Sequence, residues 1–299
     1  MREITIAGRR IADDTDAFCV AEIGGNHQGS VATCKQIIKA AADAGADAVK
    51  LQKRDMAHWA AKDPAGWHRE YHSEHAFGRT YGEHRMALEF GADEYAELKA
   101  YAEARGLVFF ATAFDVPSLR FLVELGVPAI KLASASIVDG ELLQACAEAG
   151  LPVIASTGGA TMREISEAAS ILEGHVPYAI CQCTAEYPCE ARDMNLRVIT
   201  WLRDRYPNTV IGLSDHYNGI ALAPVAYVLG ARIMERHFTL NRAAKGSDNC
   251  FSIEPVGMRK MIRDLHRTRE ALGDGIKRRL DVEIPALVKM GRADLAVPA

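Results

Sequence analysis

The chain has 299 residues, of which 49% are hydrophobic and 25% charged, a composition typical of globular proteins with a substantial core. Its formal charge of −4 gives no basic excess, which argues against a nucleic-acid or anionic-membrane partner. The first ten residues lack the apolar stretch of a secretory signal, and no run approaches the roughly 18 apolar residues of a membrane span. We therefore expect a cytoplasmic protein that acts on small molecules.

The cysteines are odd in number and scattered, without a C-x-x-C pair, which predicts reduced thiols rather than disulfides. Cys181 and Cys183 are separated by one residue, so both face the same side of a strand. We interpret them as small buried residues, with metal ligation as the alternative.

The N-terminal run ITIAGRRIAD, residues 4–13, places Gly8 between two short β-like runs and predicts a hairpin that closes the bottom of a barrel. Apolar, β-rich runs then begin at residues 18, 47, 107, 128, 152, 178, 209 and 232. Helical periodicity marks residues 31–45, 94–106, 141–150, 163–174 and 194–206, and several of these segments end in glycine. Eight strands alternating with helices predict an α/β fold, a closed (β/α)₈ TIM barrel, since an open doubly wound sheet normally uses fewer strands.

We expect one barrel domain over residues 1–280 and a short C-terminal tail over 281–299. The long irregular stretch 55–91 follows the second strand and is expected to act as a lid over the active site. It holds five histidines, and for any one of them a solvated position without function is the favoured interpretation. They are His58, His68, His72, His75 and His84.

Polar side chains fall at the C-terminal ends of the predicted strands, where barrel enzymes hold their active sites. Each one is a weak signal, but their coincidence at one end indicates a single site. The candidates are Glu22, Lys50, Gln52, Lys131, Ser134, Ser156, Ser214, His216, Glu235 and His237. Two lysines near serines suit a compact dianion such as phosphate. The alternative is a structural ion pair of Lys50 or Lys131 with Glu22 or Glu235.

His216 and His237 end consecutive strands, so their imidazoles are predicted to share a divalent cation, with Glu22 and Asp248 as oxygen ligands. This N/O donor set suits Mn²⁺ best, with Mg²⁺ or Co²⁺ as alternatives. Taken singly, each histidine would more often be a hydrogen-bonded core residue. Alternation in RIMERHF points Glu235 and His237 into the barrel mouth and Arg236 outward, where we expect it to pair against a helix.

Eight stretches, in order along the chain, resemble the sialic acid synthases (N-acetylneuraminate synthase and its relatives). They are AEIGGNHQGS at 21, AGADAVKLQK at 44, KLAS at 131, ASTGGAT at 155, CTAEYP at 183, GLSDHYNG at 212, ERHFT at 235 and KGSDNCFS at 245. The resemblance implies a TIM-barrel transferase of carbohydrate biosynthesis. Such an enzyme condenses phosphoenolpyruvate with an aldose such as N-acetylmannosamine, releases phosphate and forms a nine-carbon sialic-acid-like product.

The same resemblance implies roles for individual residues. It assigns phosphoenolpyruvate binding to Lys50, Lys131, Ser134, Ser156 and Ser214. The sugar would face Gln52, Tyr187 and Asp248, and the metal would be bound by His216 and His237. Glu22 matches the acid near the reacting carbons, and with Lys50, Lys131 and Glu235 it forms the expected catalytic set. A homodimer is also implied.

Three features separate this sequence from the family pattern. The usual glycine positions around the strand-four serine read Ala133 and Ala135, followed by Ser136. Family members usually continue into an antifreeze-like domain whose arginine contacts the sugar's acyl group, and this sequence ends about where the linker to it would begin. The second strand ends KLQKRD, which adds Lys53, Arg54 and Asp55. The extra charge suits an aldose bearing an acid or phosphate, or it serves only as a lid contact.

Three alternative functions remain open. The same chemistry could act on a different aldose or aldose phosphate, as in octulosonate- and heptulosonate-phosphate synthases. The barrel could bind a sugar acid without catalysis, or it could be an aldolase that forms a Schiff base through Lys131 or Lys50.

Overall fold

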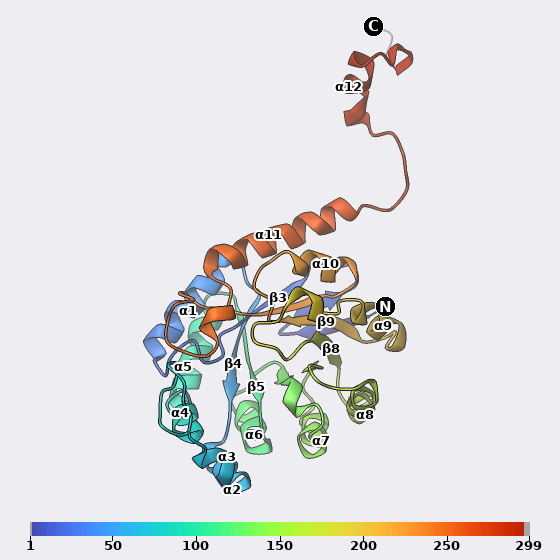
Figure 1. Cartoon of the computed structure of the whole chain (residues 1–299). Coiled ribbons are helices and arrows are strands. Elements are labelled where there is room, and N and C mark those ends of the chain that lie inside the picture. Colours follow the sequence, from blue (N-terminus) through green and yellow to red (C-terminus); the bar gives the residue numbers. More distant parts are fainter. Residues whose placement is uncertain (1, 296–299) are drawn as a thin grey trace.

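Eight parallel strands form a closed barrel in the computed structural model, which describes residues 2–295 (Figure 1). The strands run in chain order around the barrel, and β10 closes it by pairing with β3. Their bounds are β3 Phe18–Glu22, β4 Ala48–Lys53, β5 Val108–Ala113, β6 Ile130–Leu132, β7 Val153–Ser156, β8 Tyr178–Cys183, β9 Val210–Asp215 and β10 Ile233–His237. The predicted (β/α)₈ barrel is confirmed.

A ring of helices surrounds the strands, and one of them follows each strand (Figure 1). These helices are α1 Val31–Ala44, α5 Ala92–Glu103, α6 Val116–Glu124, α7 Gly140–Ala149, α8 Met162–Leu172, α9 Val198–Arg205, α10 Leu222–Val228 and α11 Pro255–Leu272. Helix α1 shows why they form where they do. The Ser30 side chain accepts a hydrogen bond from the Thr33 N–H, and Gly45 ends the helix at φ 88°, a conformation that favours glycine.

The N-terminal hairpin, β1 Glu3–Ile6 and β2 Arg9–Ala12, is antiparallel as predicted. It packs Ile4, Ile6 and Ile11 into the core. Its polar contacts reach the residues that precede the barrel strands, since Arg9 donates to the Gly106 carbonyl and Arg232 donates to the Asp13 carbonyl. The hairpin therefore closes the N-terminal end of the barrel, opposite the predicted active site.

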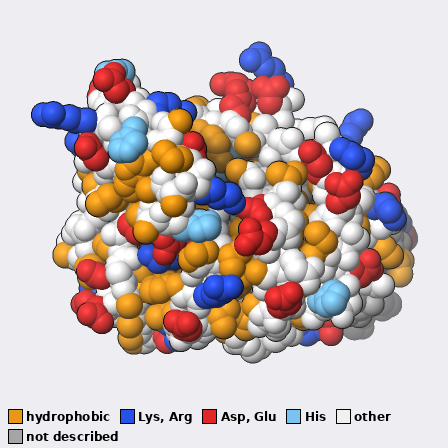
Figure 2. Space-filling model, turned by 90° about the horizontal axis from the view of Figure 1, so that it is seen from below, with side chains coloured by type: hydrophobic (Ala, Val, Ile, Leu, Met, Phe, Trp, Pro, Cys, Tyr) orange, Lys and Arg blue, Asp and Glu red, His pale blue; other side chains and the backbone are white. Residues whose placement is uncertain are grey.

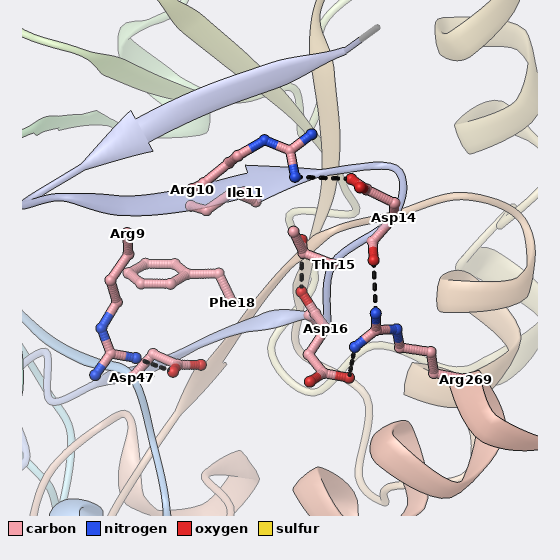
Figure 3. Close-up of a pocket in the computed structure, with 10 residues that line it drawn as sticks. Arg9, Arg10, Ile11, Asp14, Thr15, Asp16, Phe18, Asp47 and Arg269 are labelled. Carbon is pink, nitrogen blue, oxygen red and sulfur yellow. Dashed lines mark hydrogen bonds and ion pairs between the residues drawn. The ribbon is translucent and has the colours of Figure 1, made fainter.

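A cavity of about 490 Å³ lies beside this hairpin. Figure 3 shows that its arginines each face a carboxylate. Arg10 lies 2.9 Å from Asp14, and Arg269 lies 3.1 Å from Asp16. Arg9 pairs with Asp47, which precedes β4. These pairs join the hairpin and the segment after it to β4 and α11.

The segment 55–91 is not irregular, contrary to expectation. It contains three short helices, α2 Met56–Lys62, α3 Pro64–His68 and α4 Tyr81–Met86. Asp55, Asp63 and Thr80 cap them through side-chain hydrogen bonds. The histidines behave differently from one another: His72 is exposed, whereas His84 is buried and accepts a hydrogen bond from the Phe77 N–H. The caps were readable in the sequence, but the helices were too short to show periodicity.

After α11 the chain leaves the barrel, and α12 Ile284–Lys289 stands apart from it (Figure 1). The predicted tail, 281–299, begins in this region, and its last residues, 296–299, lie outside the described residues. None of the helices between residues 2 and 295 is long and apolar enough to cross a membrane. Figure 2 shows a face on which acidic and basic side chains are interspersed with apolar ones.

Candidate active site

A cavity of about 610 Å³ opens at the C-terminal ends of the strands. Every residue that the sequence singled out for the site lines it, together with residues from the 55–91 segment. The predicted members are Glu22, Lys50, Gln52, Lys131, Ser134, Ser156, Tyr187, Ser214, His216, Glu235, His237 and Asp248. The structure thus brings residues that are far apart in the sequence into one site.

Lys50 is buried in the centre of this cavity among polar partners. Its Nζ lies 2.5 Å from Glu22 Oε2 and 3.8 Å from Glu235 Oε1, and it donates a 2.7 Å hydrogen bond to Thr112. The parallel register pairs Glu22 with Lys50 across β3 and β4, which brings the two side chains together. The ion pair considered as an alternative is present, and it forms part of the cavity wall.

Lys131 is equally buried and makes a second cluster on the other side of Glu235. Its Nζ donates to Ser156 Oγ at 2.6 Å and lies 3.9 Å from Glu235 Oε1. Ser214 donates to the same Glu235 oxygen at 3.2 Å. Glu235 therefore faces both lysines while Glu22 pairs with Lys50 alone, so the cluster carries a net positive charge whenever Glu22 is protonated.

Ser134 follows β6 and is held against the loop after β7. Its Oγ accepts a hydrogen bond from the Gly158 N–H at 3.0 Å. A Cβ at position 158 would lie 2.8 Å from that oxygen, so only glycine fits without displacing the serine. Glycine is required at Gly24 for a similar reason, because a Cβ there would lie 2.7 Å from Asp248 Oδ2.

The two carboxyl groups of the cluster differ in their affinity for protons. Burial raises the pKa of Glu22 to about 7, despite the opposing effect of Lys50. Burial also acts on Glu235, but Lys131 and Lys50 outweigh it and lower its pKa. Near neutral pH, Glu235 is therefore the ionised partner of the lysines, and Glu22 exchanges a proton readily.

His216 and His237 lie side by side, with ring centroids 5.4 Å apart. Burial lowers the pKa of both, that of His216 to about 4, so both imidazoles are neutral near pH 7. His216 Nδ1 lies 2.9 Å from the Thr184 carbonyl oxygen, which leaves Nε2 as its free lone-pair nitrogen. His237 Nδ1 is buried without a hydrogen bond, 3.7 Å from Asp248 Oδ2.

This arrangement fits a divalent cation as far as the nitrogen donors are concerned. Neutral imidazoles are the form that binds metals, and an orphaned buried nitrogen calls for a partner. Over residues 2–295, however, no three His, Cys, Asp or Glu side chains form a group that could hold a metal ion. The two histidines thus supply two nitrogen donors, and no third side-chain ligand completes a group among residues 2–295.

Arg236 faces away from the cavity as expected, but its partner is not a helix. It lies 2.6 Å from Asp215 Oδ2 and donates to the carbonyl oxygens of Tyr217 and Gly219. The expectation was wrong because Asp215, pointing outward from the adjacent β9, provides a nearer partner than any helix. The pair holds the loop after β9 in place.

The three charged residues that end the second barrel strand, β4, have separate roles. Lys53 pairs with Glu89 at 2.7 Å, and Asp55 caps α2, so both are contacts to the 55–91 segment. Arg54 instead lines the cavity, with its guanidinium 3.4 Å from the centre of the Phe114 ring. Of the three residues, Arg54 alone lines the cavity, and the other two contact the 55–91 segment.

Several cavity residues were missed from the sequence. Thr112 was detectable as the polar residue in an otherwise apolar strand run, LVFFAT. The 55–91 segment was expected to cover the site, but its individual cavity residues could not be identified, because its turns cannot be read from periodicity. Those residues are Tyr71, Tyr81 and Arg85.

A parallel (β/α)₈ barrel with buried lysines, carboxylates and histidines at the C-terminal ends of its strands defines a barrel enzyme. The model of the NeuB family matches residues 37–277. The chain therefore belongs to the NeuB family, and the predicted resemblance to sialic acid synthases is confirmed.

Two curated relatives show how far the similarity extends. The human N-acetylneuraminate-9-phosphate synthase is 37% identical over 290 residues, which are 97% of this chain and 80% of that protein. The N,N'-diacetyllegionaminic acid synthase of Legionella pneumophila is 33% identical and matches 91% of this chain and 78% of its own length. Both are synthases, and this chain is an enzyme of the same transferase type.

Solved structures agree with this assignment. The N-acetylneuraminic acid synthetase of Leptospira borgpetersenii, solved with citrate, is 33% identical and superimposes with a TM-score of 0.83 over 98% of both chains. A truncated 3-deoxy-D-arabino-heptulosonate 7-phosphate synthase from Thermotoga maritima reaches a TM-score of 0.68 at 13% identity over 91% of this chain and 93% of its own. That second likeness shows the fold alone.

Proposed function

We propose that this enzyme condenses phosphoenolpyruvate with an N-acylmannosamine-like aldose to form a sialic-acid-like nonulosonic acid and phosphate. The observation that carries the proposal is the pair of buried lysines, Lys50 and Lys131, that share Glu235 within the strand-end cavity. Buried lysines are rare without a role, and two of them attract a substrate with several negative charges.

The phosphoenolpyruvate would bind against Lys131 and the hydroxyl groups around it. Ser156 already accepts a hydrogen bond from Lys131, and Ser134 and Ser214 line the same cavity. Lys50 supplies the second positive charge. Gln52, Tyr187 and Asp248 line the remainder, where we place the acceptor sugar.

In the reaction, carbon three of phosphoenolpyruvate attacks the aldehyde carbon of the acceptor, and water then adds at carbon two. Collapse of this adduct expels phosphate. Glu22 lies between Lys50 and Gln52 and is the residue we assign to steering the water and holding its proton. Glu235 keeps both lysines oriented toward the substrate.

We propose a divalent metal, Mn²⁺ rather than Mg²⁺ or Co²⁺, as cofactor. His216 and His237 would hold it, with oxygen ligands from Asp248, Glu22 or the acceptor. When bound, such an ion supplies Lewis-acid polarisation of the acceptor's aldehyde. The neutral, adjacent imidazoles support this proposal.

The names of the relatives do not select one acceptor, since one makes N-acetylneuraminate 9-phosphate and another N,N'-diacetyllegionaminic acid. Coupled phosphate release with a panel of aldoses tests the proposal. We expect phosphoenolpyruvate-dependent turnover with N-acetylmannosamine or its 6-phosphate. Turnover confined to arabinose or erythrose phosphate would instead establish the octulosonate or heptulosonate type of synthase.

The two remaining alternatives have their own tests. A non-catalytic sugar-acid-binding barrel predicts no phosphate release with any aldose. A Schiff-base aldolase predicts borohydride trapping of pyruvate at Lys131 or Lys50, which we expect to fail because the Nζ of each lysine is engaged by buried carboxylate and hydroxyl groups. We further propose a cytoplasmic homodimer from the family resemblance, to be checked by sedimentation and cell fractionation.

A further inference from the structure

Two arginines of the active-site cavity have no acidic partner within residues 2–295. Arg54 donates to Gln52 Oε1 at 3.0 Å and stacks on Phe114, and Arg85 donates to the Tyr81 hydroxyl at 2.7 and 3.1 Å. Both guanidinium groups line the same cavity. Burial and the nearby charge of Arg85 lower the pKa of Arg54 to about 10. Both guanidinium groups therefore line one cavity, and neither forms an ion pair with a carboxylate of residues 2–295.

The carboxylates that surround them are already occupied. Glu89 accepts from Lys53 Nζ at 2.7 Å and from the Arg54 backbone N–H at 3.3 Å. Asp248 accepts from the Ser247 hydroxyl at 2.7 Å and from the Gly25 N–H at 3.3 Å. The neighbouring carboxylates thus bind other groups of the chain, and both guanidinium groups can accept an acidic ligand.

Arg54 is held through its main chain by two carboxylates and through its guanidinium by Phe114. Its own N–H binds Glu89, and the next N–H, that of Asp55, donates to Asp115 at 2.9 Å. With the guanidinium flat on the Phe114 ring, little side-chain freedom remains to be lost when a ligand binds. This is the geometry of a prepared binding group rather than a solvated surface arginine.

Position along β4 says which part of the substrate meets these arginines. Lys50, Gln52 and Arg54 alternate onto the cavity face and all line it. At about 3.3 Å per residue, Arg54 lies roughly 13 Å beyond Lys50 toward the mouth of the barrel. The arginines therefore face the far end of the acceptor, well away from the lysines assigned to phosphoenolpyruvate.

We propose that Arg54 and Arg85 form a subsite for a phosphate ester at the end of the acceptor remote from its aldehyde, so that the substrate is a hexose 6-phosphate. The inference rests on the proposed function and names its substrate class. Two guanidinium groups match a dianion in charge and can bind it bidentately. Because phosphoenolpyruvate contributes three carbons, carbon six of the acceptor becomes carbon nine of the product, and the phosphate ester of the acceptor would remain there.

The test compares N-acetylmannosamine with its 6-phosphate as acceptors for the full chain and for Arg54→Gln and Arg85→Gln. We expect the wild type to prefer the phosphorylated acceptor by at least about 100-fold in kcat/KM. Each variant should lose roughly 10- to 100-fold in kcat/KM with the phosphorylated acceptor at an unchanged KM for phosphoenolpyruvate, and the loss with the free sugar should be smaller, least of all in Arg85→Gln because Arg54 also donates to Gln52. Arg85→Lys should retain part of the preference.

Arg192→Gln is the matched control, because this arginine follows β8 at the same end of the barrel but its side chain is 83% exposed. Circular dichroism and the melting temperature show that each variant is folded. A wild-type preference for the free sugar, equal losses with both acceptors, or losses in the KM for phosphoenolpyruvate alone would overturn the subsite and leave the proposed function standing. Absence of turnover with every aldose would overturn both.

Discussion

The arginines that line the cavities at the two ends of the barrel differ in their partners. At the closed end, beside the hairpin, Arg9 and Arg269 each meet a carboxylate, and the pairs fasten separate parts of the chain together (Figure 3). At the open end, Arg54 and Arg85 meet only neutral partners. The difference teaches that the partner, not the residue type or its burial, separates a charge that builds the fold from one that binds a ligand.

The lysines at the centre of the barrel fall between these cases. Lys50 and Lys131 have carboxylate partners, as the arginines at the closed end do, but they are almost fully buried and share Glu235 between them. The carboxylate that they share offsets part of the cost of burying two amino groups, and both side chains still line the cavity where an anion can reach them. The predictions below separate the two ends by measurement.

The largest effect is expected from Lys131→Met. Loss of the charge beside Ser156 should lower kcat/KM by about 10³-fold, because the lysine would stabilise charge on the departing phosphate. Initial rates of phosphate release measure this change. Arg269→Met, at the closed end, should leave kcat/KM unchanged, and a comparable loss in that variant would contradict the division between the two ends.

Glu22→Gln should lower kcat by about 10²-fold with little change in the KM for phosphoenolpyruvate, because the amide cannot take up a proton. The substitution keeps the shape of the side chain and its contact with Gln52. A steady-state kinetic comparison checks it. A variant that retained full kcat would remove Glu22 from the chemistry and leave it as the partner of Lys50 alone.

Saturating Mn²⁺ should raise the melting temperature by about 5 °C or more, since a ligand that binds only the folded state stabilises it by mass action. The double variant His216→Ala plus His237→Ala should lose this shift. The exposed His72, changed to alanine, is the control. An unchanged shift in the double variant would exclude the histidine pair as the metal site.

At the closed end, Asp13→Asn should lower the melting temperature by about 2–4 °C and leave kcat/KM unchanged. Asp13 pairs with Arg203 at 2.6 Å and with Arg2 at 3.2 Å, and such partly exposed pairs each contribute modestly. Differential scanning calorimetry and a standard assay measure both quantities. A drop in activity larger than the drop in folded protein would show that the ends are coupled.

The smallest expected effect is on the pH dependence of the free energy of unfolding, which differs between His84 at the open end and Asp13 at the closed end. Burial, followed by Arg85, lowers the pKa of His84 from 6.5 to about 4, so the unfolded chain binds more protons in that window. The free energy of unfolding should therefore fall as the pH drops from 6.5 toward 4, and His84→Gln should flatten this slope whereas His72→Gln should not.

The pKa of Asp13 is lowered because Arg203 and Arg2 outweigh its burial, so its contribution to stability is lost only below about pH 4. Urea unfolding across this range checks both windows.

The barrel could be predicted from the sequence because eight apolar runs alternate with periodic segments, and each polar strand end falls where a barrel places its active site. Alternation along β10 even separated His237 from Arg236. The outward partner of Arg236 was not predictable, because Asp215 is set by the register of β9 against β10 and not by local pattern.

The structure of the 55–91 segment was the weakest part of the prediction for a physical reason. Helices of five to seven residues are set by their caps and by tertiary contacts, and they are too short to show a hydrophobic period. Tyr81 and Arg85 lie on α4, so they line the cavity only because this short helix forms, and the sequence pattern did not predict that helix. Arg54, one residue beyond β4, could have been assigned to the cavity face by continuing the alternation of Lys50 and Gln52.

Hydrogen bonds run without interruption from Arg54 to Gln52, from Gln52 to Glu22, and on to the Lys50 ion pair. For anyone wishing to redesign the acceptor, this line makes position 54 a poor place to start, because a new side chain there would also disturb the acid beside the reacting carbons. Arg85 donates a hydrogen bond to the Tyr81 hydroxyl and takes no part in this series of hydrogen bonds. Changes of sugar preference should therefore be accessible through α4, in laboratory evolution as in natural divergence, with the catalytic centre left intact.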